Sequence, residues 1–195
     1  MASSLLLVGC SGGGPQQAST PPAGGTSSAP GATAAASADP SAEAAAAEAS
    51  KAGIDPANPP KPIASSTTAA VVEGDPNATK RVDLLGLKRS GKTVLASYAF
   101  TVTAADGASD EPRMLYHYLG NSSWRPQLVD TTNLTLHEVV RADGSAVQTD
   151  DQGVTFRPGQ TLYAYAVFAA PPESVTTIDA VLADNVPAVP GAPIS

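Results

Sequence analysis

The residues whose spacing most resembles a chemical motif run from Gly86 to Thr93. They fit the pattern G-x-x-x-x-G-K-[ST], in which backbone amides and a lysine surround a phosphate. That chemistry requires the segment to leave a strand and open a helix, so that the helix N-terminus faces the phosphate. The residues after Lys92 instead alternate between apolar and polar types, as a strand does. We therefore predict a hairpin that turns at Ser90 and Gly91, and no nucleotide cofactor.

Acid–base or metal chemistry would have to use the two histidines, His117 and His137. Each alternates with its neighbours as a strand residue does, so we expect both on solvent-facing strand positions. No serine lies in the G-x-S-x-G pattern of a nucleophile, and the acidic loop residues between Asp106 and Asp151 have no calcium-loop frame. We predict no catalytic residue, no metal site and no cofactor, and hence a protein that is not an enzyme.

The single cysteine, Cys10, follows a short apolar run and precedes a glycine-rich stretch. The order Leu7-Val8-Gly9-Cys10 resembles a bacterial lipobox, in which the cysteine sulfur receives a diacylglycerol and the preceding peptide is removed. Each acyl chain contributes about 0.8 kcal/mol per buried CH₂, so two or three chains hold a protein on a membrane face. We expect residues 1–9 to be a truncated signal peptide, with the true start upstream, and Cys10 to be the lipidation site. The alternative is a solitary free thiol.

Residues 10–75 consist mainly of Ala, Ser, Thr, Pro and Gly. Such a segment buries too little apolar area to offset the entropy lost on ordering, so we predict a disordered tether. Within it, Asp39 to Lys51 carries the signature of a helix start, with Pro in the first turn and an early Glu. This helix has no apolar stripe that would dock it, which favours a fluctuating coil there.

All nine aromatic residues lie between Tyr98 and Phe168, so the core must lie in the second part of the chain. Residues 76–195 show short apolar–polar alternations separated by turn residues, with no convincing helix. The pattern predicts an all-β antiparallel β-sandwich of seven or eight strands with an immunoglobulin-like arrangement. The expected strands are Arg81–Leu87, Thr93–Thr103, Arg113–Leu119, Leu128–Thr131, Leu134–Val140, a strand beginning at Gln148 or Val154 and ending at Phe156, Leu162–Phe168 and Val175–Leu182.

The carboxyl half contains Phe156-Arg157-Pro158-Gly159-Gln160, followed by a strand into Ala169-Ala170-Pro171-Pro172. Over residues 80–194 this pattern resembles the immunoglobulin-like domains of secreted actinobacterial proteins, including small mycobacterial secreted antigens and lipoprotein modules found beside OmpA-like domains. The resemblance implies a β-sandwich for extracytoplasmic interaction with no established active site. No OmpA-like domain follows here, so peptidoglycan binding of that kind is not implied.

Five aromatic residues cluster in sequence and are candidates for a binding face, because aromatic rings on a sheet can bind sugar, peptide or wall polymer. Burial in the sandwich core is the competing and favoured interpretation. The five residues are Tyr116, Tyr118, Trp124, Tyr163 and Tyr165.

The net charge of −7, without a cluster of lysines and arginines, argues against a nucleic-acid partner. Together these features predict a lipid-anchored, extracytoplasmic, non-enzymatic binding or cell-envelope structural module. Its expected partners are the membrane, through the lipid, and a cell-envelope protein or wall polymer. The alternative is a ligand-binding or enzyme-accessory lipoprotein that assists a neighbouring partner.

Overall fold

The computed structural model describes residues 40–195, and within that range it contains two helices and twelve strands. The helices are α1 (Pro40–Lys51) and α2 (Leu115–Tyr118). The strands are β1 (Ala64–Ala69), β2 (Thr79–Ser90), β3 (Thr93–Thr103), β4 (Arg113–Met114), β5 (Gln127–Asp130), β6 (Thr135–His137), β7 (Arg141–Ala142), β8 (Ser145–Ala146), β9 (Thr155–Phe156), β10 (Thr161–Ala169), β11 (Thr177–Val181) and β12 (Val189–Pro193).

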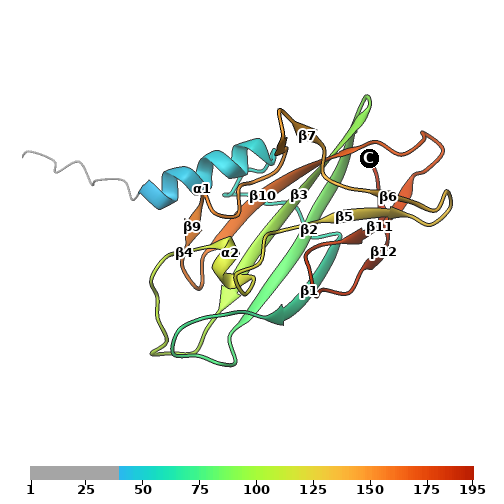
Figure 1. The fold of residues 1–195 in the computed structure, drawn as a ribbon. Helices are drawn as coiled ribbons and strands as arrows, with labels where there is room; N and C mark the ends of the chain where they lie inside the picture. Colours follow the sequence, from blue (N-terminus) through green and yellow to red (C-terminus); the bar gives the residue numbers. More distant parts are fainter. Residues whose placement is uncertain (1–39) are drawn as a thin grey trace, which may run out of the picture. The chain divides into compact units, whose positions relative to one another are not determined.

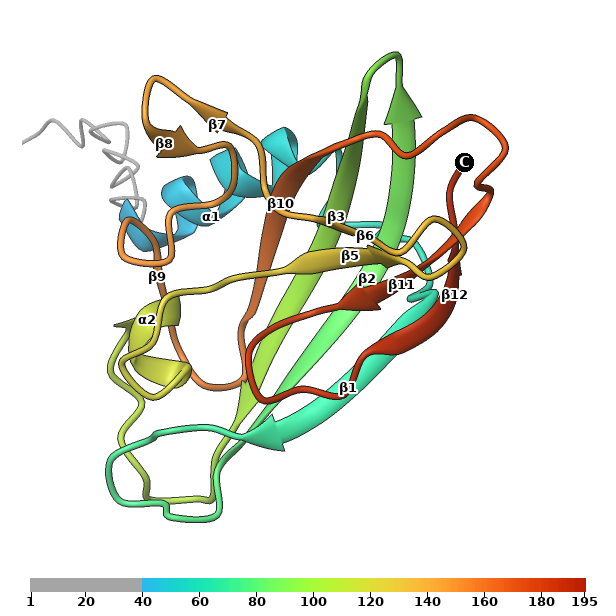
Figure 2. The same ribbon diagram turned by 45° about the vertical axis from the view of Figure 1, so that its right-hand side comes forward.

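Two four-stranded sheets form the layers of a sandwich (Figures 1 and 2). One has the order β1-β2-β3-β10 and the other the order β12-β11-β5-β6, with antiparallel pairing throughout both. Two small ribbons, β4-β9 and β7-β8, complete the described strands. The prediction of an all-β antiparallel sandwich is confirmed.

The hairpin of β2 and β3 is the longest pairing in the fold, and its sequence explains its geometry. In β3, Val94, Ala96 and Tyr98 lie at every second position and are completely buried, as the alternation predicts. In β2 the register shifts between Leu84 and Gly86, which marks a β-bulge. The extra residue moves the alternation by one place, so that Leu87 is buried on β2 as Leu84 is.

Trp124 lies in the core and contacts β3 of one sheet and the residue that follows β11 of the other. Its ring meets the rings of Tyr98 and Phe100 edge-on, with centroids 5.1 and 5.3 Å apart. Its indole N–H donates to the carbonyl of Leu182, which follows β11, at 2.9 Å. The polar atom of this large side chain is therefore satisfied inside the core, as burial requires.

The two sheets are also connected at both edges by main-chain contacts. After β12 the chain pairs with β2, where Ser195 N–H donates to the carbonyl of Leu87 at 2.9 Å. After β6 the chain crosses to β10, where Val140 N–H donates to the carbonyl of Val167 at 2.8 Å. These contacts cover parts of the β2 and β10 backbones that would otherwise be open.

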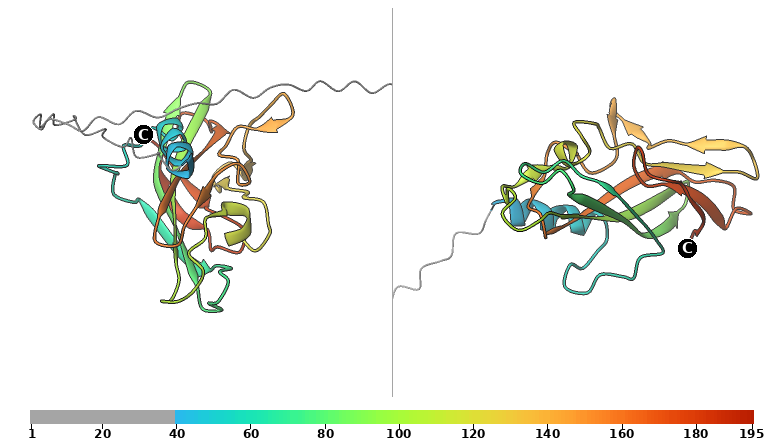
Figure 3. Two further views of the ribbon diagram at one scale, coloured as in Figure 1. Left: turned by 90° about the vertical axis from the view of Figure 1, so that its left-hand side faces the viewer. Right: turned by 90° about the horizontal axis from the view of Figure 1, so that it is seen from below.

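A helix and a strand lie within the predicted tether, before residue 76, which corrects its predicted carboxyl-terminal limit. Residues Pro40–Lys51 form α1 and residues Ala64–Ala69 form β1, which pairs with β2. Alanines replace an apolar stripe here, since Ala49 of α1 and Ala52, which follows the helix, are buried. Figure 3 shows α1 lying along the sheet that contains β10. The rest of the predicted tether, residues 10–39, lies outside the described residues, as does the predicted signal peptide.

Within the sandwich, the prediction of a strand over Arg113–Leu119 is wrong beyond its first two residues. The chain forms β4 and then one turn of helix, α2, which buries Leu115 and Tyr118 on the same side. The period-2 pattern of this segment matches a helical turn equally well over so few residues. Strand β12 was also not predicted, because its two prolines are atypical of strands. Of the two helices that the structure describes, neither is long and apolar enough to span a bilayer.

Two buried tyrosines provide a matched test of hydrogen bonding in the core. The hydroxyl of Tyr98 is buried without a hydrogen-bond partner, whereas that of Tyr118 donates to the carbonyl of Phe156 at 2.9 Å. We expect Tyr98→Phe to leave the free energy of unfolding unchanged or raised. Tyr118→Phe should lower it by about 1 kcal/mol, because a carbonyl loses its donor. Urea denaturation of both variants measures the difference, and an equal loss in both would contradict the assignment.

Candidate functional site

An open cleft of about 560 Å³ lies where β5, the end of β6 and the β7–β8 ribbon meet. Its lining is mainly polar, and we call it the Arg125–Arg141 cleft. The residues that line it with polar side chains are Ser123, Arg125, Gln127, Glu138, Arg141, Gln148 and Asp151. They come from three segments of the chain, so no short motif contains them.

The floor of the cleft is held by hydrogen bonds to the backbone of Trp124. Its N–H donates to the carboxylate of Asp151, and its carbonyl accepts from the side-chain amide of Gln148 at 3.0 Å. Burial raises the pKa of Asp151, an effect that the N–H of Trp124 partly opposes and the charge of Asp150 reinforces. Anchoring by Trp124 therefore fixes the position of two lining residues.

The charged side chains of the cleft are two arginines, the exposed carboxylate of Glu138 and the buried carboxylate of Asp151. Arg125 and Arg141 are exposed, and neither belongs to an ion pair among residues 40–195. Arg141 donates to the carbonyl of Gly144 in its own ribbon, which fixes the direction of its side chain. Glu138 is also exposed and lines the same cleft. This set can bind carboxylate or phosphate groups through the arginines, and hydroxyl or amino groups through Glu138 and the glutamines.

The predicted aromatic binding face is not assembled as one surface. Tyr118 and Trp124 are buried in the core, with 1% and 2% of their surfaces exposed. The prediction that they belong to a binding face is therefore wrong. Tyr116 lies on α2, and Tyr163 and Tyr165 lie on the outward side of β10, all three half-buried. The competing core interpretation therefore holds for two of the five residues. Sequence alternation alone does not separate an inward from an outward aromatic in a short segment.

The two histidines lie on different elements. His117 is on α2, not on the predicted strand, and His137 ends β6. Within the described part of the chain no hydrogen bond joins either histidine to a hydroxyl, as activation of a serine would need. Residues 40–195 also contain no group of three potential ligands that would hold a metal ion.

The segment that resembles a phosphate loop forms a hairpin, as predicted. Its turn lies between β2 and β3, and Gly91 there has a φ of +56°, which only glycine adopts readily. Arg89 uses its guanidinium group to hold the loop after β10, donating to the carbonyls of Pro171 at 2.6 Å and Val175 at 3.1 Å. Arg89 therefore binds the protein's own backbone, whereas the side chain of Lys92 is exposed.

Sequence reasoning did not identify the cleft residues, because neither arginine is part of a recognisable spacing. The β7–β8 ribbon that carries Arg141 was not among the predicted strands; its turn residues Asp143 and Gly144 both have positive φ angles. The lipidation candidate Cys10 lies outside the described residues. Family models, curated proteins and solved structures were compared with the chain, and none matches it.

Substitution at Arg89 and Lys92 separates a structural hairpin from a phosphate loop. We expect Arg89→Ala to lower the free energy of unfolding by about 2 kcal/mol, because several carbonyls lose a charged donor. Lys92→Ala should leave stability unchanged, because its side chain is exposed. Thermal denaturation measures both effects, and a parallel titration with a fluorescent ATP analogue serves as the control. Nucleotide binding that Lys92→Ala abolishes would contradict the hairpin interpretation.

Proposed function

We propose that this protein is a lipid-anchored, extracytoplasmic and non-enzymatic binding module that contacts a polymer or protein of the cell envelope through the Arg125–Arg141 cleft. The observation that carries the proposal is the cleft itself, where two exposed arginines outside ion pairs of the described chain line an open polar groove. Such a groove suits a ligand that bears carboxylate or phosphate groups next to hydroxyl groups, as anionic wall polymers do.

The sandwich provides a rigid support for such a contact. Trp124 ties the cleft to the core, and the β7–β8 ribbon carries Arg141 close to the main sheet. A binding site held by backbone hydrogen bonds loses little conformational entropy when a ligand binds. These features support binding as the role of the sandwich, and the lipobox-like sequence at Cys10 supports attachment of the protein to a membrane.

The second candidate is an accessory role towards a neighbouring envelope protein. The β5–β6 hairpin exposes two leucines, Leu134 at 91% and Leu136 at 50%. Leu134 also has a φ of +53°, a conformation that bulky residues rarely adopt. A strained backbone that holds two apolar side chains in solvent offers a surface for a protein contact, so this observation favours a protein partner at that hairpin.

Binding through the cleft can be tested with Arg125→Gln and a matched control, Lys88→Gln, which removes an exposed charge on β2 outside the cleft. Co-sedimentation with purified cell-wall material measures affinity. We expect Arg125→Gln to weaken binding by about tenfold, because one charge-assisted hydrogen bond is lost, and Lys88→Gln to bind as the original protein does. Equal binding by both variants would remove the cleft from the proposal.

Membrane attachment depends on Cys10 in this proposal. We expect Cys10→Ser to move the protein from the detergent phase to the aqueous phase when cells are extracted with Triton X-114, because the acyl chains are no longer attached. Mass spectrometry of the mature amino terminus should show a diacylglyceryl modification on Cys10 in the original protein alone. An unmodified thiol together with unchanged partitioning would contradict lipidation.

A further inference from the structure

Helix α1 is attached to the sheet by a small apolar contact and a few polar ones. Ala49 and Ala52 are buried, with 0% and 2% of their surfaces exposed. At the end of the helix, the hydroxyl of Ser97 on β3 donates to the carbonyl of Ala52 at 2.6 Å. Alanine side chains bury little area, and an isolated helix of this length is marginally stable in water. The polar contacts are therefore important for keeping α1 docked.

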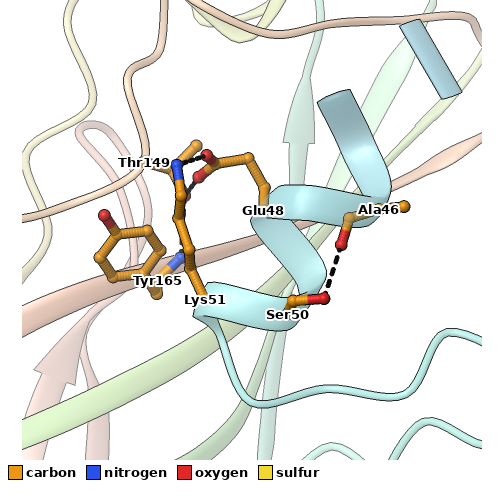
Figure 4. A network of polar contacts seen from close by, with 6 residues as sticks. All are labelled: Ala46, Glu48, Ser50, Lys51, Thr149 and Tyr165. Atoms are coloured by element: carbon orange, nitrogen blue, oxygen red, sulfur yellow. Dashed lines mark hydrogen bonds and ion pairs between the residues drawn. The ribbon is translucent and has the colours of Figure 1, made fainter. Parts of the chain in front are cut away.

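Glu48 makes the principal polar contact of α1, and Figure 4 shows its surroundings. Only 6% of this residue is exposed. One carboxylate oxygen accepts a hydrogen bond from the hydroxyl of Thr149 at 2.6 Å, and the other accepts one from the ammonium group of Lys51 at 2.6 Å. Lys51 thus balances the charge of Glu48 from the same helix, while Thr149 binds it across the interface. A buried carboxylate needs both kinds of partner.

Thr149 joins α1 to strand β10. Its N–H donates to the carbonyl of Tyr165 on β10 at 2.9 Å, and its hydroxyl oxygen accepts from the N–H of Tyr165 at 3.1 Å. Thr149 is 1% exposed, so these bonds are shielded from water. The contact from Glu48 therefore ends on a residue whose N–H and hydroxyl oxygen both bind the backbone of Tyr165.

The residues on either side of Thr149 belong to the cleft. Gln148 and Asp151 both line it, and both hold the backbone of Trp124. A hydrogen bond therefore links Glu48 to Thr149, and from Thr149 the chain itself leads to Gln148 and Asp151, whose side chains hold the floor of the cleft. Rigid, hydrogen-bonded segments of this kind can carry energetic coupling between two sites.

We propose that α1 is a latch whose docking on the sheet stabilises the binding-competent form of the Arg125–Arg141 cleft. When α1 is docked, Glu48 holds Thr149 and thereby the segment that contains Gln148. When α1 leaves the sheet, this segment loses a charged partner and the cleft wall loosens. Because coupling is reciprocal, a ligand in the cleft also favours the docked helix. The ligand side of this coupling rests on the proposed function.

The position of α1 in the chain gives the latch a physiological input. Residues 1–39, which include Cys10, precede α1 directly. A partner or anchor that holds these residues is connected to the sandwich along the chain through α1. Attachment at the amino terminus and occupancy of the cleft are thereby linked in the proposal.

Hydrogen exchange of the full chain tests the latch without any ligand. The matched variants are Glu48→Ala and Glu43→Ala, which make the same change at a buried and at an exposed position of α1. We expect Glu48→Ala to speed amide exchange by about tenfold both in α1 and in residues 146–151. In Glu48→Ala we also expect the fluorescence of Trp124, the only tryptophan of the chain, to shift to longer wavelength. Glu43→Ala should change neither measurement.

A second pair, Ala49→Asp and Ala46→Asp, places a charge at a buried and at an exposed position of the same helix. In both pairs of variants, slow hydrogen exchange of the amides in the β2–β3 hairpin shows that the sandwich remains folded. Faster exchange in α1 with unchanged exchange in residues 146–151 would overturn the latch. Unchanged exchange in α1 in both Glu48→Ala and Ala49→Asp would overturn it as well.

Co-sedimentation of the same variants with purified cell-wall material tests the ligand side. Glu48→Ala should bind several-fold more weakly than Glu43→Ala. If the original protein fails to bind wall material, the proposed function fails, whereas the exchange result still decides whether α1 and the cleft wall are coupled. Binding that is equal in the two variants, although exchange in residues 146–151 differs, would overturn the regulatory role of the latch.

Discussion

Trp124 packs between the two sheets, with Tyr98 and Phe100 edge-on to its ring and its indole N–H bonded to the carbonyl of Leu182. The same residue uses its backbone N–H and carbonyl to hold Asp151 and Gln148 at the surface. One side chain thus contributes to the cohesion of the core, while its main chain determines the floor of the cleft. The stability of the sandwich and the shape of the cleft therefore depend on the same residue.

Buried acidic groups act in this protein mainly as acceptors for backbone amides. Asp75 accepts from the N–H groups of Asn77 and Ala105 and so joins two loops at 2.8 Å each. Asp130 accepts from Thr132 and Asn133 at the start of the β5–β6 hairpin, and these bonds, led by the side chain of Asn133, lower the pKa of Asp130. These carboxylates are engaged in building loops, which distinguishes them from free acid–base groups.

The arginines have two different roles, one structural and one at the cleft. Arg89 donates to carbonyls of the loop after β10 and has a structural role, whereas Arg125 lines the open cleft outside any ion pair of the described residues. The segment around Arg89 matches a phosphate-binding pattern letter for letter, yet the structure bends it into a hairpin. In contrast, the residues best placed for binding match no pattern. Their relevance arises from the contact between β5, the end of β6 and the β7–β8 ribbon.

Local chemistry in the sequence determined the central β2–β3 hairpin, the strands β5, β10 and β11, and hence the all-β sandwich. Period-2 alternation and glycine-containing turns act over a few neighbouring residues, so they can be read without knowing the fold. Only the tertiary structure decided that α1 docks, that β1 pairs and that the cleft forms. Glu48 and Thr149 are 101 residues apart, and the alanines of α1 are apolar enough to bury only once a sheet is there to receive them. Such contacts gain their free energy from partners distant in the chain, and composition and spacing carry no record of those partners.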